Sequence, residues 1–315
     1  MLIVVILFIL GIILIIKGGD IFTDGAIWLA GYTGIPQVII GATVVSVATT
    51  VPEFTVSLIA TLSGHPDMAV GNVVGSSIVN IGLILALSIL IAPVIVTNSM
   101  KKGSLIMVSS GVIFVFFLQD KTITSVNAVF LLAMMIPYFI YNFRHANIKK
   151  NSQNGNIKDS SQTGAIKKNL ILFGLGAVLI IVGSKLLIDN GSKIAEFLGI
   201  PELLIALTFI SLGTSLPELV TAATSALKGN PEIGAGNVLG ANFLNMTMIF
   251  GGTALIVPVP IPDQTLILDA PVMLSLMFAT TLFLFNFKKL NRIHGLIIIT
   301  IYSIYLYMLV NNSYI

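Results

Sequence analysis

Long apolar runs, separated by short polar or glycine-containing breaks, dominate the pattern of this 315-residue chain. A helix needs about 20 apolar residues to cross the roughly 30 Å hydrocarbon core of a bilayer. The fold class we expect is therefore an all-α integral membrane protein. The pattern predicts ten transmembrane helices, at residues 2–32, 36–63, 67–93, 103–119, 123–143, 169–198, 201–227, 231–257, 264–286 and 293–310.

The composition agrees with a chain that uses lipid as much of its solvent. Hydrophobic residues make up 56% and charged residues 9%, with a mean hydropathy of +1.02, whereas soluble domains carry about 25% charged residues. The absence of cysteine excludes disulfides, structural zinc sites and thiol nucleophiles. The three histidines lie at the ends of apolar runs, so we expect no histidine-based metal cluster. The net charge of +3 comes from basic loops, and we expect no nucleic-acid partner.

One long polar stretch, residues 144–168, divides the chain into an N-terminal unit, 1–143, and a C-terminal unit, 169–315, each with five predicted spans. Its Asn, Ser, Gly and Lys content is typical of a flexible linker. Basic residues concentrate in cytoplasmic loops, so we expect this linker to be cytoplasmic and both termini to lie outside. Further basic residues fall on the same predicted side, namely Lys101, Lys102, Lys228, Lys288, Lys289 and Arg292.

An internal repeat relates the two units. A shift of 165 residues places residues 34–80 on 199–245 without a gap, aligning GIPQVIIGATVVSVATTVPE with GIPELLIALTFISLGTSLPE and GNVVGSSIVN with GNVLGANFLN. Because each unit has an odd number of spans, the second enters the membrane from the opposite side. The sequence therefore predicts two inverted five-helix repeats, an arrangement common in secondary transporters.

The segments TTVPE, ending at Glu53, and TSLPE, ending at Glu218, lie within the second and seventh spans. A proline inside a helix removes one backbone hydrogen bond and clashes with the preceding turn, so we expect both helices to break there. Backbone freed at membrane depth is tolerated where it lines a polar cavity. A carboxylate at the bilayer centre costs at least about 2.5 kcal/mol, and these spans contain no basic partner.

Two glutamates brought together at the midplane require a cation between them. Calcium accepts 6–8 oxygen ligands from carboxylates, amides, carbonyls and hydroxyls. A single glutamate could be a protonated packing residue, but two at equivalent repeat positions favour an ion site. Small residues of the GNVVGS and GNVLGA motifs predict close helix packing, and Asn72 and Asn237 are expected to bond the broken backbone. The predicted ligand set is Glu53, Glu218, Thr50, Ser215, Asn80, Asn245, Ser76 and the carbonyls near Ser46 and Ser211.

These paired motifs closely resemble the two alpha repeats of the sodium/calcium exchangers, within the cation/calcium antiporter superfamily, and the resemblance covers nearly the whole chain. It implies a ten-helix bundle in which spans 2, 3, 7 and 8 surround the ion site, with 3 and 8 also broken at the midplane, and spans 1 and 6 slide past them. It further implies that Glu53 and Glu218 are shared calcium and sodium ligands. By the same resemblance Thr49, Thr50, Thr214 and Ser215 supply hydroxyl or carbonyl ligands, Ser46 and Ser211 supply carbonyls to outer sodium sites, and Asn80 and Ser76 form a polar wall.

Three positions depart from the family pattern. Ala48 replaces a glycine that Gly213 keeps in the second repeat, and Ala241 stands where Ser76 has a hydroxyl. Asn245 is an amide where several relatives have an aspartate, so the formal charge of the site rests on two carboxylates.

We therefore expect a secondary antiporter that exchanges sodium for calcium and is not an enzyme, has no cofactor and works as a monomer in the lipid bilayer. With a site charge of −2, a third sodium ion would make exchange electrogenic. The alternatives are proton/calcium or other cation antiport through the same carboxylates, an ion channel, an intramembrane hydrolase, for which no histidine base lies in a span, and a structural scaffold.

Overall fold

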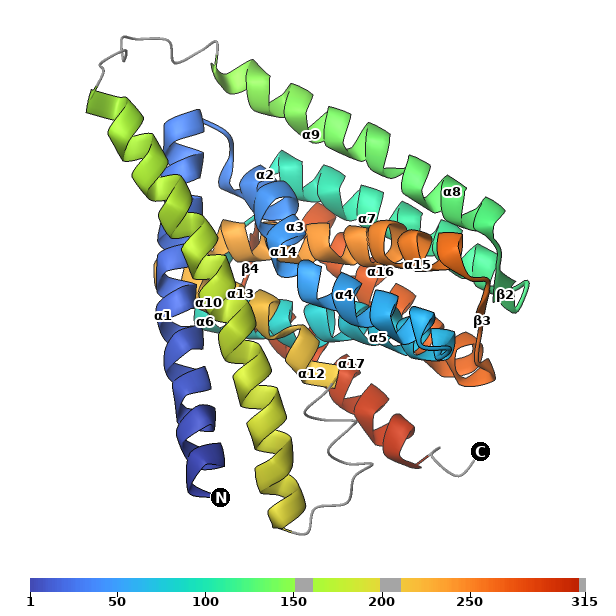
Figure 1. Ribbon diagram of the computed structural model, residues 1–315. Coiled ribbons are helices and arrows are strands. Elements are labelled where there is room, and N and C mark those ends of the chain that lie inside the picture. The colour runs from blue at the N-terminus through green and yellow to red at the C-terminus, as the bar shows by residue number, and fades with distance from the viewer. Residues whose placement is uncertain (151–160, 199–210, 312–315) are drawn as a thin grey trace.

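The structure is a computed structural model that describes residues 1–150, 161–198 and 211–311. It is almost entirely helical (Figure 1). In the first half the elements are α1 (Leu2–Thr33), α2 (Gln37–Ile40), the π-helical turn η1 (Gly41–Val45), α3 (Ser46–Thr49), α4 (Val51–Leu62), α5 (Pro66–Val79), η2 (Asn80–Leu85), α6 (Ala86–Ile91), β1 (Val94–Ile95), α7 (Asn98–Leu118), β2 (Thr122–Ile123), α8 (Ser125–Ala133) and α9 (Met135–Lys150).

The second half follows a similar order. Its described elements are α10 (Ser161–Phe197), α12 (Ser211–Thr214), α13 (Leu216–Leu227), α14 (Pro231–Leu244), η4 (Asn245–Ile249), α15 (Phe250–Ile256), β3 (Val259–Pro260), η5 (Thr265–Asp269), α16 (Ala270–Asn286), β4 (Lys289–Leu290) and α17 (Arg292–Asn311).

Eight helices of the described chain are long and apolar enough to cross a membrane, and the bent pair that runs from α2 to α4 makes nine. The protein is therefore an all-helical integral membrane protein. The predicted span 201–227 begins outside the described residues, which resume with α12 and α13. The predicted linker 144–168 is helical at both ends, because α9 continues to Lys150 and α10 begins at Ser161. A helix already nucleated in the membrane adds further turns at little cost.

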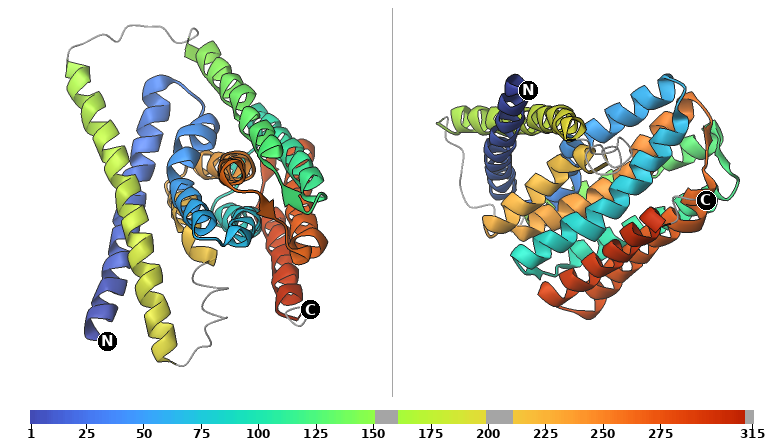
Figure 2. Two further views of the ribbon diagram at one scale, coloured as in Figure 1. Left: turned by 45° about the vertical axis from the view of Figure 1, so that its right-hand side comes forward. Right: turned by 90° about the horizontal axis from the view of Figure 1, so that it is seen from below.

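The helices fall into two groups (Figures 1 and 2). The two longest, α1 and α10, cross each other along most of their length. The others pack side by side in a bundle, with α5 and α14 in its interior, and α13 touches α1. Apolar side chains of α5, α7, α14, α15 and α16 form the main core.

Glycines allow the backbones of α14 and the α2–η1 segment to approach closely. A Cβ on Gly236 would lie 2.3 Å from the carbonyl oxygen of Val38, and one on Gly240 would lie 2.5 Å from that of Ala42. Backbone atoms cannot move aside as a side chain can, so these positions exclude larger residues. The close packing predicted for the GNVLGA motif is confirmed, whereas the prediction is wrong for the GNVVGS motif, because a Cβ added at Gly71 or Gly75 would meet nothing within 4 Å.

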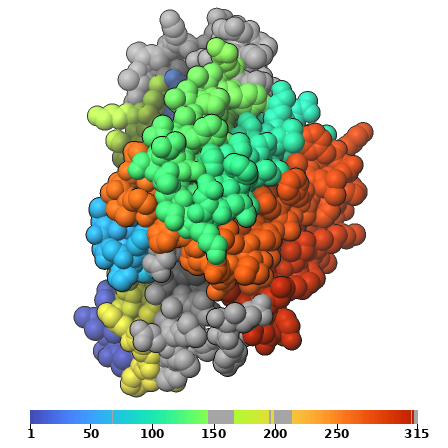
Figure 3. Space-filling view, turned by 90° about the vertical axis from the view of Figure 1, so that its right-hand side faces the viewer, coloured from blue at the N-terminus to red at the C-terminus, as the bar shows by residue number. Residues whose placement is uncertain are grey.

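Two short antiparallel sheets join sequence-distant loops. Strand β1 pairs with β4, with Val94 opposite Leu290, and β2 pairs with β3, with Ile123 opposite Val259. Each sheet contains one strand from before the linker and one from after it. They lie at opposite ends of the bundle in Figure 1. Figure 3 views the β2–β3 end, where green residues of the first half adjoin orange residues of the second.

Candidate ion-binding site

Two helix interruptions frame the candidate site. Helix α3 ends at Thr49 and α4 begins at Val51, with a bend of 40° between them; α12 ends at Thr214 and α13 begins at Leu216. A proline in the first turn of each following helix, Pro52 or Pro217, has no N–H to give to the preceding turn. The interruptions fall at Thr50 and Ser215, within the TTVPE and TSLPE segments.

Spans 3 and 8 do not break as predicted. Residues 68–91 and 231–256 are each one continuous helix. At Asn80 and Asn245, instead, the helices pass into the π-helical turns η2 and η4. Neither turn contains a proline, so the backbone keeps its hydrogen bonds through a wider turn. Turns of this kind are frequent at functional sites.

Glu53 and Glu218 occupy the first turns of α4 and α13, and each is about 1% exposed. Their carboxyl groups lie close enough to influence each other's charge, with Ser215 beside Glu53 and Thr49 beside Glu218. Among the described residues, none of the four carboxylate oxygens has a hydrogen-bond partner. No ion pair in this part of the chain includes either glutamate.

Further oxygen atoms are buried near these interruptions without partners. The hydroxyls of Thr50, Ser76 and Ser215 and the amide oxygen of Asn80 make no hydrogen bond within the described structure. They lie on segments that pack together, since α13 contacts η2 and α12 contacts α5. Carboxylate, hydroxyl and amide oxygens are the ligands that hard cations such as Ca²⁺ and Na⁺ use. Within the described chain, no group of three or more His, Asp or Glu side chains is placed to hold a metal ion.

Asn72 and Asn237 connect the two interruptions crosswise. The Asn72 amide nitrogen donates to the carbonyl oxygen of Glu53 at 3.1 Å, and its amide oxygen accepts from the Thr214 hydroxyl at 3.2 Å. The Asn237 amide oxygen accepts from the Thr49 hydroxyl at 3.1 Å. Asn72 thus bonds a backbone carbonyl in the first turn after the interruption, whereas Asn237 bonds the side chain of Thr49.

An amide network joins the two π-helical turns. Asn80 donates to the Asn242 amide oxygen at 3.1 Å, Asn242 donates to the Ser77 carbonyl at 3.3 Å, and Asn245 donates to the Ser77 hydroxyl at 3.4 Å. Ser77 and Asn242 were not among the residues predicted from the sequence. They could have been found from the sequence, because both are polar and the 165-residue shift aligns them with each other.

Ser46 and Ser211 are the residues predicted to supply carbonyl ligands to outer sodium sites. The Ser46 carbonyl accepts the Thr50 N–H at 2.9 Å and lies 3.3 Å from the Thr49 hydroxyl, so at least one of its two lone pairs is used within its own segment. The Ser46 hydroxyl donates to the Thr43 carbonyl. The Ser211 side chain lies outside the described residues.

Acidic residues of α1 pair with the loop after α13. The Lys228 ammonium donates to Asp24 at 2.7 Å and lies 3.5 Å from Asp20. This ion pair connects α1 to the bundle and lies apart from the glutamates.

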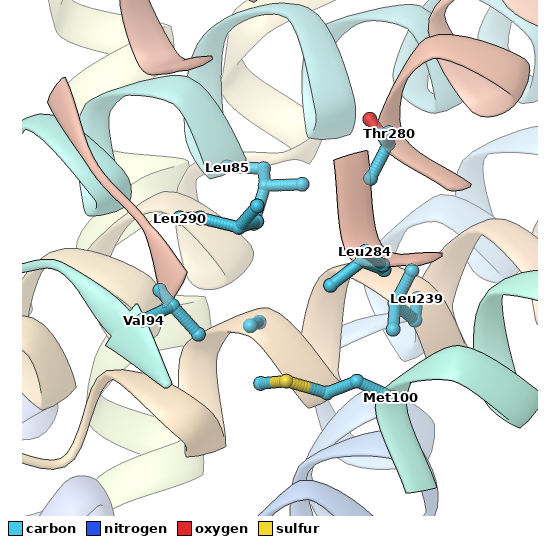
Figure 4. A pocket seen from close by; sticks show the side chains of 8 residues that line it. Leu85, Val94, Met100, Leu239, Thr280, Leu284 and Leu290 are labelled. Atoms are coloured by element: carbon cyan, nitrogen blue, oxygen red, sulfur yellow. The ribbon is translucent and has the colours of Figure 1, made fainter. Parts of the chain in front are cut away.

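A small cavity elsewhere in the bundle is apolar. Seven of its eight lining residues are apolar and the other is Thr280, and none is a predicted ligand (Figure 4). They are Leu85, Val94, Met100, Ala235, Leu239, Thr280, Leu284 and Leu290. The cavity is therefore not the cation site.

An all-helical membrane protein whose helices are interrupted around buried carboxylates has the features of a membrane cation transporter. A family model described as sodium/calcium exchanger protein matches residues 3–144 and 168–311. The chain belongs to the sodium/calcium exchanger protein family.

Similar proteins cover nearly the whole chain. Inner membrane protein YrbG of Escherichia coli is 33% identical over 287 residues, 89% of this chain and 88% of that protein. Sodium/calcium exchanger MaX1 of Methanosarcina acetivorans is 29% identical over 338 aligned residues, 95% of this chain and 96% of the relative. A structure of the sodium-calcium exchanger NCX_Mj, soaked with Na⁺ and Sr²⁺, superposes with a TM-score of 0.86 at 28% identity, covering 97% of this chain and 98% of that one.

Proposed function

We propose that this protein is a secondary-active antiporter that exchanges sodium for calcium across the membrane by alternating access. The observation that carries the proposal is the pair of buried glutamates, Glu53 and Glu218, whose carboxylate oxygens have no partner among the described residues. Family membership and a relative named as a sodium/calcium exchanger support sodium and calcium as the two exchanged ions.

The proposed site uses the two glutamates as ligands shared by calcium and sodium. The neighbouring hydroxyls and amides add neutral oxygens, and their buried, unpaired state supports this role. The full proposed set is Glu53, Glu218, Thr49, Thr50, Thr214, Ser215, Ser46, Ser211, Asn80, Ser76 and Asn245. With two carboxylates the site is neutralised by one calcium or two sodium ions. A third sodium would move one net charge per cycle, worth about 2.3 kcal/mol per 100 mV.

We further propose ten spans arranged as two inverted five-helix repeats, 1–143 and 169–315, joined by the linker 144–168. Three observations support this arrangement. The interruptions at Thr50 and Ser215 are related by the 165-residue shift; the π-helical turns at Asn80 and Asn245 share that relation; and each small sheet joins one strand from each half. In alternating access, α1 and α10 would slide as a pair against the bundle.

The proposed orientation has both termini outside and the linker in the cytoplasm. Basic residues gather at one end of the bundle, which supports this sidedness. Lys101 lies over the Phe285 ring, Lys102 lies over the Tyr141 ring, and Arg292 donates to the Leu90 carbonyl. Positive residues favour the cytoplasmic face. We propose that the single chain is the transporting unit, since both glutamates come from it.

The proposal is tested in proteoliposomes loaded with sodium, by radiolabelled calcium uptake after external sodium is replaced with choline or potassium, or after a pH step. Uptake that requires the outward sodium gradient is the expected result. Uptake that only the pH step drives would instead establish proton/calcium antiport through the same site. Calcium flux without any counter-ion gradient would indicate a channel.

A further inference from the structure

The two asparagines that connect the helix interruptions are equivalent in sequence but differ in their bonding. The Asn72 amide nitrogen has two acceptors, the Glu53 carbonyl at 3.1 Å and the Ser57 hydroxyl at 2.8 Å. The Asn237 amide nitrogen has no acceptor among the described residues, although the side chain is fully buried.

One substitution between the repeats accounts for much of this difference. The 165-residue shift aligns Ser57 of α4 with Ala222 of α13. Ser57 is fully buried and its hydroxyl accepts from Asn72. Ala222 is equally buried but has no hydroxyl, so the amide nitrogen of Asn237 lacks the partner that Asn72 has.

The threonine hydroxyls bonded to these asparagines also differ, because Thr214 is held more firmly than Thr49. The Thr214 hydroxyl donates to Asn72, whose amide is fixed at both its oxygen and its nitrogen. The Thr49 hydroxyl lies beside the Glu218 carboxyl and within bonding distance of two further acceptors, the Asn237 amide oxygen at 3.1 Å and the Ser46 carbonyl at 3.3 Å. A hydroxyl has one proton to donate, so Thr49 can alternate between them. Rotation of the Asn237 amide breaks only one hydrogen bond, and rotation of Asn72 breaks three.

We propose that Ser57 is a positioning residue for the ion site, holding the Thr214 hydroxyl in one orientation through Asn72, while the absence of its counterpart at Ala222 leaves Thr49 adjustable. The two repeats thus contribute one fixed and one adaptable hydroxyl. This inference rests on the proposed function, because it assigns unequal roles to two of the proposed ligands.

A double-mutant cycle tests the connection between Ser57 and Thr214. The variants are Ser57→Ala, Thr214→Ala and the double variant, and the measured quantities are calcium affinity, by equilibrium binding of radiolabelled calcium to purified protein, and the KM and maximal rate of sodium-driven uptake. We expect Ser57→Ala to weaken calcium binding and raise KM about threefold to tenfold, as for loss of one buried hydrogen bond. The maximal rate should change less than about twofold, and in the Thr214→Ala background the effect of Ser57→Ala should disappear. Ser57→Thr, which keeps the hydroxyl, should restore the wild-type KM.

Ser225→Ala is the matched control. Ser225 is also fully buried, but its hydroxyl donates to the Ala222 carbonyl of its own helix. The reciprocal variant Ala222→Ser supplies the missing acceptor for Asn237, and we expect it to lower KM by about twofold only while Thr49 is present. If Ser57→Ala cannot be purified, the KM of Ala222→Ser tests the positioning role on its own.

Equal KM values for Ser57→Ala and Ser225→Ala, or an undiminished effect of Ser57→Ala in the Thr214→Ala background, would overturn the positioning role. If the wild type still takes up calcium in a sodium-driven manner, such a result rejects the positioning role but not the proposed function. Absence of that uptake in the wild type contradicts the proposed function instead.

Discussion

Glu53 and Glu218 carry the largest unfavourable energy in the site. An unpaired carboxylate at the bilayer centre costs at least about 2.5 kcal/mol, and both side chains are about 1% exposed. Their positions in the first turns of α4 and α13 place them at the positive ends of helix dipoles. Such a dipole contributes about 0.3–1 kcal/mol, which is less than the cost. We propose that a bound cation is the partner that makes up the difference.

Removal of either charge should abolish exchange. For Glu53→Gln or Glu218→Gln we expect sodium-driven calcium uptake to fall by more than about 100-fold, because loss of an outer partner of a metal site already costs about 10- to 100-fold. Glu232→Gln is the matched control. Glu232 also follows a proline in the first turn of a helix, α14, but is partly exposed. Uptake by Glu53→Gln at a level equal to that of Glu232→Gln would contradict the assignment.

Calcium should also stabilise the folded protein through these residues. A ligand that binds only the folded state raises its stability by about 2.7 kcal/mol at 100 times Kd. We expect calcium to raise the Tm of the purified wild type by several degrees and to leave that of Glu53→Gln unchanged. Without calcium the variant should be at least as stable as the wild type, since it buries one unpaired carboxylate instead of two. Thermal unfolding in detergent, with calcium or with a chelator, measures both effects.

At the scale of helices, the glycines of α14 decide how closely the bundle packs around the site. Gly236 lies against the Val38 backbone, and a Cβ there has no space. We expect Gly236→Ala to destabilise the protein by about 1–3 kcal/mol. Gly31→Ala, in α1, is the control, because nothing lies within 4 Å of its added Cβ. It should be neutral or slightly stabilising, since alanine favours helix by about 1 kcal/mol. Equal unfolding temperatures for the two variants would contradict the close packing.

Sequence patterns predict some of these elements better than others. The first span, predicted at 2–32, is α1 (Leu2–Thr33), and the last, predicted at 293–310, is α17 (Arg292–Asn311), because apolar length is a local property. The interruption at Thr50 was predictable from the missing N–H of Pro52. The π-helical turn at Asn80, whose side chain bonds Asn242, was not, since neither a proline nor another local signal marks it.

Some features of the candidate site could likewise be predicted from the sequence, and others could not. The repeat singled out Glu53 and Glu218, and their mutual proximity matches that expectation. The use of the Ser46 carbonyl within its own helix and the unequal bonding of Asn72 and Asn237 depend on side-chain geometry that no spacing encodes.

At the scale of the whole molecule, two small sheets and one ion pair connect parts that are distant in sequence. β1–β4 and β2–β3 join the two halves at opposite ends of the bundle, and Lys228 connects the bundle to α1. The sheets thus fix the ends of the helices around the site, while α1 and α10 contact the bundle along one side (Figure 2).

The proposed orientation can be tested directly because the chain has no cysteine. Lys288 and Asp263 are exposed and belong to loops at opposite ends of the bundle. We expect Lys288→Cys to react with a membrane-impermeant maleimide only from the cytoplasmic side, and Asp263→Cys only from outside. Labelling of both from one side contradicts the predicted span 264–286 between them, and exchanged sides contradict the proposed orientation.

The most direct test of sodium/calcium exchange is to follow both ions in the same proteoliposomes, with labelled sodium inside and labelled calcium outside, for the wild type and Glu53→Gln. We expect calcium entry and sodium exit to begin together, to keep a constant ratio and both to be lost in the variant. Calcium entry at an unchanged rate in vesicles without sodium, or sodium exit that is indifferent to external calcium, would contradict this exchange.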